Sequence, residues 1–414
     1  MPNKSMSAGG RRIAAVSASL ALLAVLTACG SAGSGAGGED TIKVMQIVDI
    51  TSPAIVSYPQ IAEAGKSAVA DINARGGIDG KTIDLVTCDS KVDPNATTNC
   101  ARQAVSEGVV AVIGTYAQNA DKIIPILEQA KIPYIPAYAA APQEFRSNIS
   151  FPINSQMTNV AGLGVVTGRE CKSTDIALID APGLETLGAL MQAGLESEGS
   201  PEPTVISIPL SPGDYSGQAA QIVESGADCL IAFVGPANAA VLYPALEAAG
   251  FHGRIAGYQG NSISPNLIEA TPDLLESALN VSFFIPYTDP KWDTYREIVA
   301  KYSDPKQYDF STAGAQLAYL DYLVFEQVVG TILKDGDDVT AASLLAQLNK
   351  TSAAETGGLL PVLDFTQEAP IKDYPRMFNR QIAFEIVEGG EQVPLGDGQF
   401  VDLTAVIQSV FGKA

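Results

Sequence analysis

Polar side chains that could hydrogen-bond a small ligand follow several short apolar runs of this sequence. Within Val109–Ala141, two such runs are joined by the helix-patterned Ala120–Lys131 and lead into the loops Gly114–Asn119 and Ala137–Ala141. A short apolar run bounded by glycine indicates a strand buried on both faces, so this stretch predicts a βαβ unit. Small ligands bind beyond the carboxyl ends of parallel strands, where helix N-termini offer free N–H groups. The two loops are therefore the predicted seat of a ligand.

The chemistry available in these loops is hydrogen bonding by neutral groups. No lysine or arginine occurs in Gly114–Asn119, Ala137–Glu144 or Gly257–Ser264. An anionic ligand would therefore rely on backbone amides and helix dipoles. The candidate ligand-binding residues are Tyr58, Tyr116, Gln118, Asn119, Tyr138, Ala140, Asp180, Asn238, Gln259 and Asn261.

Each candidate also has a structural alternative. Tyr58 and Tyr138 could line a domain surface with their hydroxyls in water, since tyrosine is often half-buried. Asp180 could cap a helix or face solvent. The amide side chains could cap helices and turn the chain, as asparagine often does. Their shared position at predicted strand ends is what favours the ligand-binding interpretation.

Other patterns that resemble chemical motifs do not assemble an active site. Gly80-Lys81-Thr82 resembles the end of a phosphate-binding loop, but Arg75 stands where its first glycine must be. The glycines of 162–168 have the wrong spacing for a dinucleotide site and lie in a helical pattern, which indicates close helix packing. The chain has one histidine, His252, and no C-x-x-C pair. We therefore expect no enzyme, no metal and no cofactor.

The N-terminus has the pattern of an export signal. Lys4, Arg11 and Arg12 precede the apolar Ile13–Val25, which is too short to span a bilayer because a span needs about 20 residues. Leu26-Thr27-Ala28-Cys29 then resembles the lipobox of bacterial lipoproteins, in which the cysteine is lipidated. The alternative is a signal peptide with an incidental cysteine. We expect a signal peptide over 1–28 and a flexible Gly/Ser tether over 29–40.

The remaining chain is strongly acidic. The full sequence has 25 basic and 46 acidic residues and a formal charge of −21; without the three basic residues of 1–28 the charge is −24. Such a surface repels nucleic acid and anionic lipid, so membrane attachment would come from the N-terminal lipid. The length suggests two or three domains.

Four further cysteines fit a compartment that permits disulfides. Cys88 ends a predicted strand, and Cys100 lies one or two turns into the helix that Asp93-Pro94 would start, so a short disulfide between them is sterically easy. Cys171 and Cys229 precede two later strands and would meet at one sheet edge if those strands are neighbours.

Helix and strand patterns alternate along the chain in two series. Three helices then follow without matching strands, which implies that the chain returns to complete the first domain. Those helices are Trp292–Tyr302, Phe310–Leu333 and Thr340–Lys350, the last capped by Thr340. The expected strands are Ile42–Val48, Thr82–Thr87, Val109–Ile113, Ile132–Pro136, Phe151–Asn154, Asp175–Ile179, Val205–Ile208, Leu230–Phe233, Arg254–Ala256, Leu279–Phe284, Gln381–Val387 and Phe400–Leu403.

The run Ala68–Gly80, with Asp93-Pro94 and the strand entering Gly114, resembles the type I periplasmic binding proteins, specifically the leucine/isoleucine/valine-binding branch that serves ABC importers. The resemblance covers about Thr41 to Val387. It implies an α/β fold of two doubly wound parallel-sheet lobes, joined by a three-stranded hinge that closes around a ligand. The implied lobes are 41–154 with 286–361, and 155–285 with 362–414. The implied crossovers are Ile153–Ser155, Phe284–Thr288 and Leu360–Asp364.

The pocket that the resemblance implies is altered in this sequence. Tyr116, Gln118 and Asn119 replace the serine-rich loop that holds the ligand carboxylate in the amino-acid binders, and Ala140 replaces a threonine. Gln259 stands where the family has the acidic partner of the ligand ammonium. Burying an ammonium without that partner costs several kcal/mol, so the changes disfavour a free α-amino acid.

The resemblance implies a monomeric, lipid-anchored extracytoplasmic solute-binding protein of an ABC importer. It would bind a small polar metabolite, branched-chain amino acid-like or related, and deliver it to a membrane permease. The alternative is a sensing module that presents its closed form to a membrane receptor or regulator. We expect no nucleic-acid partner.

Overall fold

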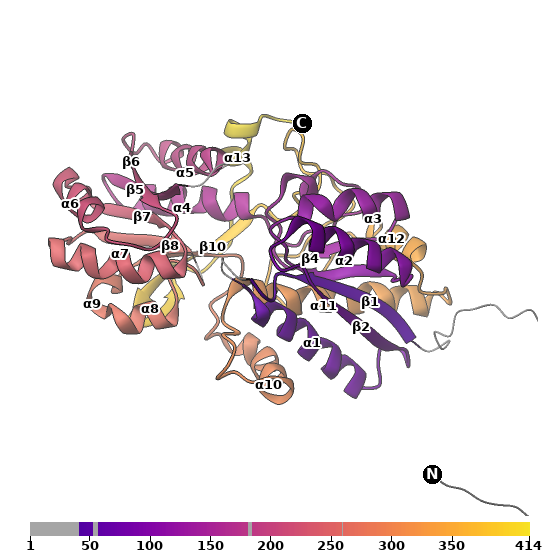
Figure 1. Cartoon of the computed structure of the whole chain (residues 1–414). Coiled ribbons are helices and arrows are strands. Elements are labelled where there is room, and N and C mark those ends of the chain that lie inside the picture. The colour runs from indigo at the N-terminus through magenta and orange to yellow at the C-terminus, as the bar shows by residue number, and fades with distance from the viewer. Residues whose placement is uncertain (1–40, 53–56, 181–183, 259) are drawn as a thin grey trace, which may run out of the picture. The chain divides into compact units, whose positions relative to one another are not determined.

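Two β-sheets flanked by helices form the frame of the part of the chain that the computed structural model describes, residues 41–52, 57–180, 184–258 and 260–414 (Figure 1). The first sheet has the order β2-β1-β3-β4, and the second runs β11-β10-β9-β8-β7-β5-β6 with β12 beside β10. In each sheet the strand that comes first in the sequence, β1 or β5, lies inside the sheet and not at its edge, as in doubly wound parallel sheets. The predicted α/β fold with parallel sheets in two lobes is confirmed.

The first sheet is parallel throughout. Its strands are β1 (Thr41–Val48), β2 (Thr82–Asp89), β3 (Ala111–Thr115) and β4 (Tyr134–Pro136). The helices of this part are α1 (Pro59–Ala74), α2 (Pro94–Ser106), η1 (Ala120–Lys122), α3 (Ile124–Ala130) and η2 (Pro142–Phe145). The predicted start of α2 is confirmed, since the Asp93 carboxylate accepts the Ala96 N–H at 2.7 Å and Pro94 takes the first helical position.

Side chains of β1 alternate between two apolar layers, as a strand buried on both faces requires. Val44 and Val48 pack with residues of α1, whereas Met45 and Ile47 pack with residues of α2. The sheet is therefore covered on both faces, and its carboxyl-end loops are left to form a site.

The second sheet is parallel from β6 to β9 and ends in antiparallel strands. Its strands are β5 (Thr174–Asp180), β6 (Thr204–Pro209), β7 (Cys229–Phe233), β8 (Arg254–Tyr258), β9 (Leu279–Ser282), β10 (Gln381–Glu388), β11 (Glu391–Pro394) and β12 (Val401–Asp402). Its helices are α4 (Gln156–Glu170), α5 (Glu185–Ser197), α6 (Ser216–Ser225), α7 (Pro236–Ala249), α8 (Pro265–Ala270) and α9 (Pro272–Leu275).

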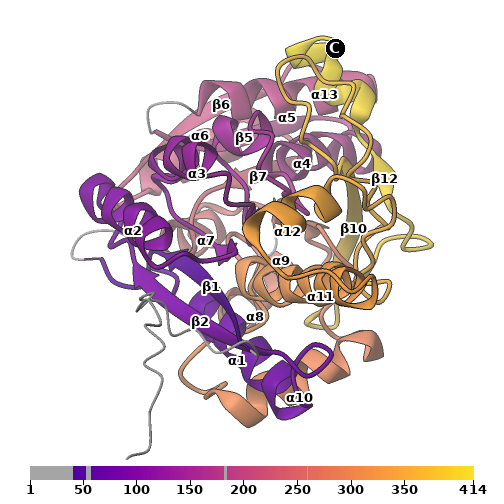
Figure 2. The ribbon, with the colours of Figure 1, turned by 90° about the vertical axis from the view of Figure 1, so that its right-hand side faces the viewer.

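The last helices divide between the two sheets. η3 (Pro290–Trp292), α10 (Asp293–Tyr302), α11 (Ala313–Lys334) and α12 (Ala341–Leu348) follow β9, and α13 (Thr404–Phe411) ends the chain. Helices α10 and α11 pack on α1, and α13 packs on α5 (Figure 2). The Thr340 cap of α12 is confirmed by a hydrogen bond from the Ser343 N–H at 3.1 Å. The lobe boundaries given above stay predictions.

Both disulfides anticipated from the sequence are present, Cys88–Cys100 and Cys171–Cys229. The second forms because β5 and β7 are neighbours and Cys229 lies opposite Thr174 in their register. Close packing of the helical glycines is also confirmed: a Cβ on Gly164 would collide with the Met191 carbonyl of α5.

Two local expectations were wrong, and two further elements had no counterpart in the expectations. Phe151–Asn154 is not a strand; the nearest pairing is an isolated bridge from Tyr134 to Ser150. The helix expected over Ala120–Lys131 is split into η1 and α3, because Pro125 in its interior would lack an N–H and clash with the preceding turn. The strand β11 and the helix α13 were not anticipated.

Several expectations lie outside the described residues. They are the signal peptide 1–28, the lipidated Cys29, the tether 29–40 and the ligand contact Gln259. Among the helices of the described ranges, none is long and apolar enough to cross a membrane.

Candidate ligand-binding site

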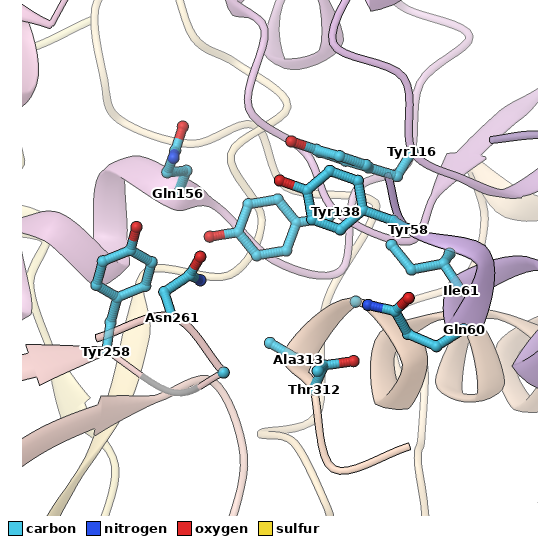
Figure 3. Close-up of a pocket in the computed structure, with 12 residues that line it drawn as sticks. Tyr58, Gln60, Ile61, Tyr116, Tyr138, Gln156, Tyr258, Asn261, Thr312 and Ala313 are labelled. Atoms are coloured by element: carbon cyan, nitrogen blue, oxygen red, sulfur yellow. The ribbon is translucent and has the colours of Figure 1, made fainter. Parts of the chain in front are cut away.

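A cavity of about 140 Å³ lies between loops of the two sheets and the starts of three helices (Figure 3). It is a site built from the carboxyl ends of β3, β4 and β8, the position at which α/β sheets bind small molecules. Its lining residues are Tyr58, Gln60, Ile61, Tyr116, Tyr138, Gln156, Tyr258, Gly260, Asn261, Thr312, Ala313 and Gly314.

A bulge at the end of β3 directs Tyr116 toward the cavity. The register between β3 and β4 shifts between Ile113 and Thr115, and Gly114 has φ +65°. That left-handed conformation favours glycine, and a Cβ there would touch the Tyr322 ring at 3.4 Å. Bulges beside functional sites commonly re-aim a side chain, as this one does.

Asp49, immediately after β1, holds the surrounding loops together. It is fully buried, and its carboxylate accepts hydrogen bonds from the Ser90 hydroxyl (2.6 Å), the Val92 N–H (2.9 Å) and the Gln118 N–H (2.8 Å). Its carbonyl accepts the Tyr58 N–H at 2.7 Å. Asp49 thus ties together the ends of β1, β2 and β3 through its carboxylate, and it holds the start of α1 through its carbonyl.

Tyrosine rings form one wall of the cavity. Tyr58 and Tyr116 have ring centroids 4.8 Å apart, Tyr116 and Tyr138 5.7 Å, and Tyr138 and Phe283 5.8 Å, all edge to face. The hydroxyls of Tyr58 and Tyr116 are hydrogen-bonded to each other. Edge-to-face contact is a preferred geometry for aromatic pairs, so the wall is rigid without charged partners.

The facing side of the cavity comes from the second sheet. Tyr258 ends β8 and stacks on Phe233 at 5.1 Å, and Asn261 follows in the next turn. Gln156 is the first residue of α4. In Figure 3 the hydroxyl of Tyr138 points toward the side that Gln156, Tyr258 and Asn261 line.

Three helices begin at the cavity. Gln60 and Ile61 lie in the first turn of α1, Gln156 opens α4, and Ala313 and Gly314 open α11. The first N–H groups of a helix lack intrahelical partners and carry a partial positive charge. The cavity is therefore richer in main-chain donors than its side chains alone suggest.

The tyrosines around the cavity are neutral phenols. Burial raises the pKa of Tyr116, Tyr138 and Tyr258 above its ordinary value, and the same cause raises that of Tyr58. The negative charge of Asp49 adds to the rise for Tyr58 and Tyr116. At neutral pH each hydroxyl can donate and accept hydrogen bonds without carrying charge.

The structure brings four of the sequence candidates together at this cavity: Tyr58, Tyr116, Tyr138 and Asn261. Three others lie nearby but outside its lining. Gln118 has an exposed side chain and contributes its N–H to Asp49. Asn119 precedes η1, and the N–H of Ala140 donates to the buried Glu144 carboxyl at 2.9 Å.

Asp180 and Asn238 lie elsewhere. Asp180 is exposed at the end of β5 and lines a different surface depression. Asn238 is 7% exposed, and its amide donates to the carbonyls of Pro209 and Leu210 and to the Tyr215 hydroxyl at 2.7 Å. Its side chain therefore fixes a loop of the second sheet.

Sequence reasoning missed Gln60, Gln156, Tyr258 and Thr312. The signal for Tyr258 was present, because it precedes Gln259 in the stretch taken for a ligand contact. Gln156 follows Phe151–Asn154, which was wrongly expected to be a strand, and Thr312 follows no predicted strand; both reach the cavity through the path of the chain between the sheets. In the described ranges no cluster of three metal-ligating side chains occurs.

Residues 41–370 match the family described as periplasmic binding protein. The Leu/Ile/Val-binding protein of Escherichia coli (strain K12) is 31% identical over 105 residues, which is 25% of this chain and 29% of that protein. The chain thus spans less than a third of the length of that curated relative. The match over residues 41–370 confirms the sequence-based assignment to this family.

Solved structures show the same fold. A branched-chain amino acid ABC transporter protein from Thermus thermophilus with bound valine has a TM-score of 0.74 and 17% identity, covering 90% of this chain and 99% of that one. A solute-binding protein of an ABC transporter from R. palustris in complex with 4-hydroxybenzoate has a TM-score of 0.68 and 20% identity, covering 88% and 98%. Identity at this level shows the fold alone.

Proposed function

Because this chain belongs to the periplasmic binding protein family, we propose that it is the extracytoplasmic solute-binding component of an ABC importer. Its ligand would be a small polar metabolite, an amino acid or a related compound, held in the cavity between the two sheets. The solved proteins of this fold hold valine in one case and 4-hydroxybenzoate in another, which sets the range of ligands to test.

The observation that carries the proposal is that one cavity is lined from both sheets. Tyr116 and Tyr138 follow strands of the first sheet, and Tyr258 and Asn261 follow β8 of the second. A ligand that contacts both sides stabilises the arrangement in which they are close, so binding shifts the population toward a closed form.

Segments that pass between the sheets are tied by specific hydrogen bonds. The Asn379 amide donates to the Ile153 carbonyl at 3.1 Å, and the Thr158 hydroxyl donates to the Asn379 carbonyl at 3.1 Å. We propose that the crossovers Ile153–Ser155, Phe284–Thr288 and Leu360–Asp364 form the hinge, with lobes 41–154 plus 286–361 and 155–285 plus 362–414.

Lipid attachment at Cys29 and delivery to a membrane permease belong to the same proposal. They are supported by the basic and apolar segments before Cys29 and by the two disulfides, which persist in oxidising compartments.

A thermal-shift screen of amino acids, amides, polyols and aromatic acids, followed by small-angle X-ray scattering, tests this function. A ligand at a hundredfold excess over its Kd stabilises the folded state by about 2.7 kcal/mol, which is readily visible. We expect at least one compound to raise Tm and to reduce the radius of gyration. Stabilisation by no compound in the screen would contradict the proposal.

Asn261→Ala serves as the site variant, and Asn238→Ala as its matched control. Both remove a carboxamide from the second-sheet side, but only Asn261 lines the cavity. The ligand-induced rise in Tm should shrink in Asn261→Ala and persist in Asn238→Ala.

A further inference from the structure

None of the described residues that line the cavity has an acidic side chain to pair with an ammonium group. Among its lining residues that the structure describes, the polar ones are tyrosines, carboxamides and a threonine. The sequence at 53–56, 181–183 and 259 also contains no ionisable side chain. Asp49 is buried behind Tyr58 and Tyr116, and three donors already occupy its carboxylate. A buried ammonium without a partner is strongly unfavourable.

The cavity does offer hydrogen-bond donors to an oxygen acceptor. The helices α1, α4 and α11 begin there, and in the described structure none of their N-cap residues, Tyr58, Ser155 and Thr312, caps its helix with a side chain. Pro59 has no N–H, the Ile61 N–H donates to the Tyr58 carbonyl, and the Gln156 N–H donates to the Ala139 carbonyl. The main-chain donors among the lining residues at the helix starts are therefore the N–H groups of Gln60, Ala313 and Gly314. These groups and the positive ends of three helix dipoles favour an acceptor and disfavour a cation.

Two phenolic hydroxyls reach the cavity from its two sides. Tyr138 and Tyr258 both line it, and burial raises the pKa of each, so both hydroxyls stay protonated at neutral pH. Each can donate and accept a hydrogen bond, so a ligand with polar groups of its own suits the cavity.

The wall of tyrosine rings favours a ligand that contains a planar ring over a ligand that presents a cation. Cation–π recognition needs ring faces turned toward one centre. The rings here are in T-shaped contact with one another, from Tyr58 through Tyr116 and Tyr138 to Phe283. A planar ring can extend this edge-to-face series.

We propose that the ligand is a ring compound that presents a carboxylate or carboxamide oxygen and carries no ammonium group. This inference rests on the proposed solute-binding function and narrows its ligand class. The oxygen would accept hydrogen bonds at the helix starts, and the ring would pack on the tyrosine wall.

Isothermal titration calorimetry with a matched series tests the proposal: 4-hydroxybenzoate, 4-hydroxybenzamide and 4-hydroxybenzylamine, with leucine added as a zwitterion. We expect the benzoate or the benzamide to bind at least tenfold more tightly than the benzylamine and leucine. Which of the two binds better distinguishes a carboxylate from a carboxamide ligand.

Tighter binding of the benzylamine or leucine would overturn the ligand class and leave the solute-binding function standing. Absence of binding by both the benzoate and the benzamide would also overturn it. Failure of the solute-binding function itself is a different result, namely stabilisation by no compound in the broader screen.

Gln156→Glu places a carboxylate at the start of α4, inside the cavity. It should weaken binding of the oxygen-acceptor compound at least tenfold and strengthen binding of 4-hydroxybenzylamine. Gln129→Glu, on the exposed side of α3, makes the same chemical change away from the cavity and should alter neither. Equal effects of the two substitutions would contradict the proposal.

Discussion

Replacing Glu385 with glutamine should make folding stability less dependent on pH. Glu385 lies in β10 opposite Asn280 of β9, and its side chain accepts a hydrogen bond from the Asn280 amide at 2.6 Å. The residue is 1% exposed. Burial raises the pKa of its carboxyl from 4.5 to about 8, and the Asn280 hydrogen bond opposes part of that rise.

The direction of the pH effect follows from the protons that the folded and the unfolded chain bind. The folded protein keeps the Glu385 proton up to about pH 8, whereas the unfolded chain releases it near 4.5. The stability contributed by the protonated carboxyl is therefore complete below the lower pKa and is lost as pH rises toward 8. Each pKa unit corresponds to about 1.4 kcal/mol, so the stability gap between Glu385→Gln and the parent should widen by about 3–4 kcal/mol from pH 5 to pH 8.

Denaturant unfolding of both proteins at pH 5 and pH 8 measures this difference. Glu388→Gln, exposed at the end of the same strand, is the matched control and should leave the pH dependence unchanged. Equal pH dependence of the parent and Glu385→Gln would refute the argument.

Asn238→Ala should lower the free energy of unfolding by about 2 kcal/mol, because the Leu210 carbonyl and the Tyr215 hydroxyl lose their Asn238 donor; an unchanged unfolding midpoint would contradict its structural role. Asn261→Ala should instead weaken ligand binding about tenfold in calorimetry, the cost of one hydrogen bond, and unchanged affinity would exclude Asn261 from the site. Replacing Cys171 and Cys229 with serine should lower the free energy of unfolding by about 4 kcal/mol, because that disulfide closes a loop of 58 residues. Replacing Cys88 and Cys100 with serine should lower it by about 3 kcal/mol, because the loop there is only 12 residues long. The reverse order in urea unfolding would refute the loop-entropy argument.

The parts of the site that follow buried strands could be predicted from sequence. A strand covered on both faces is a continuous apolar run, and the loop after it must lie at the sheet edge, which is where Tyr116, Tyr138 and Asn261 line the cavity. The same logic located the start of α2 and both disulfides.

The positions of the other residues depend on tertiary packing, which the local sequence does not show. Asn238 also follows a buried strand, but its amide meets carbonyls of a distant loop that local sequence does not reveal. Gln156 and Thr312 reach the cavity because α4 and α11 happen to begin there. Phe151 and Ile153 are buried in the main hydrophobic cluster, so this stretch has the apolar composition of a strand although it does not form one.

A crystal structure with the compound that binds most tightly in the screen tests the central claim most directly. We expect ligand density between Tyr138 and Asn261, with atoms in contact with residues of both sheets and an oxygen near the N–H groups of Gln60, Ala313 or Gly314 at the starts of α1 and α11. Density confined to another depression, such as the one that Asp180 lines, would contradict it.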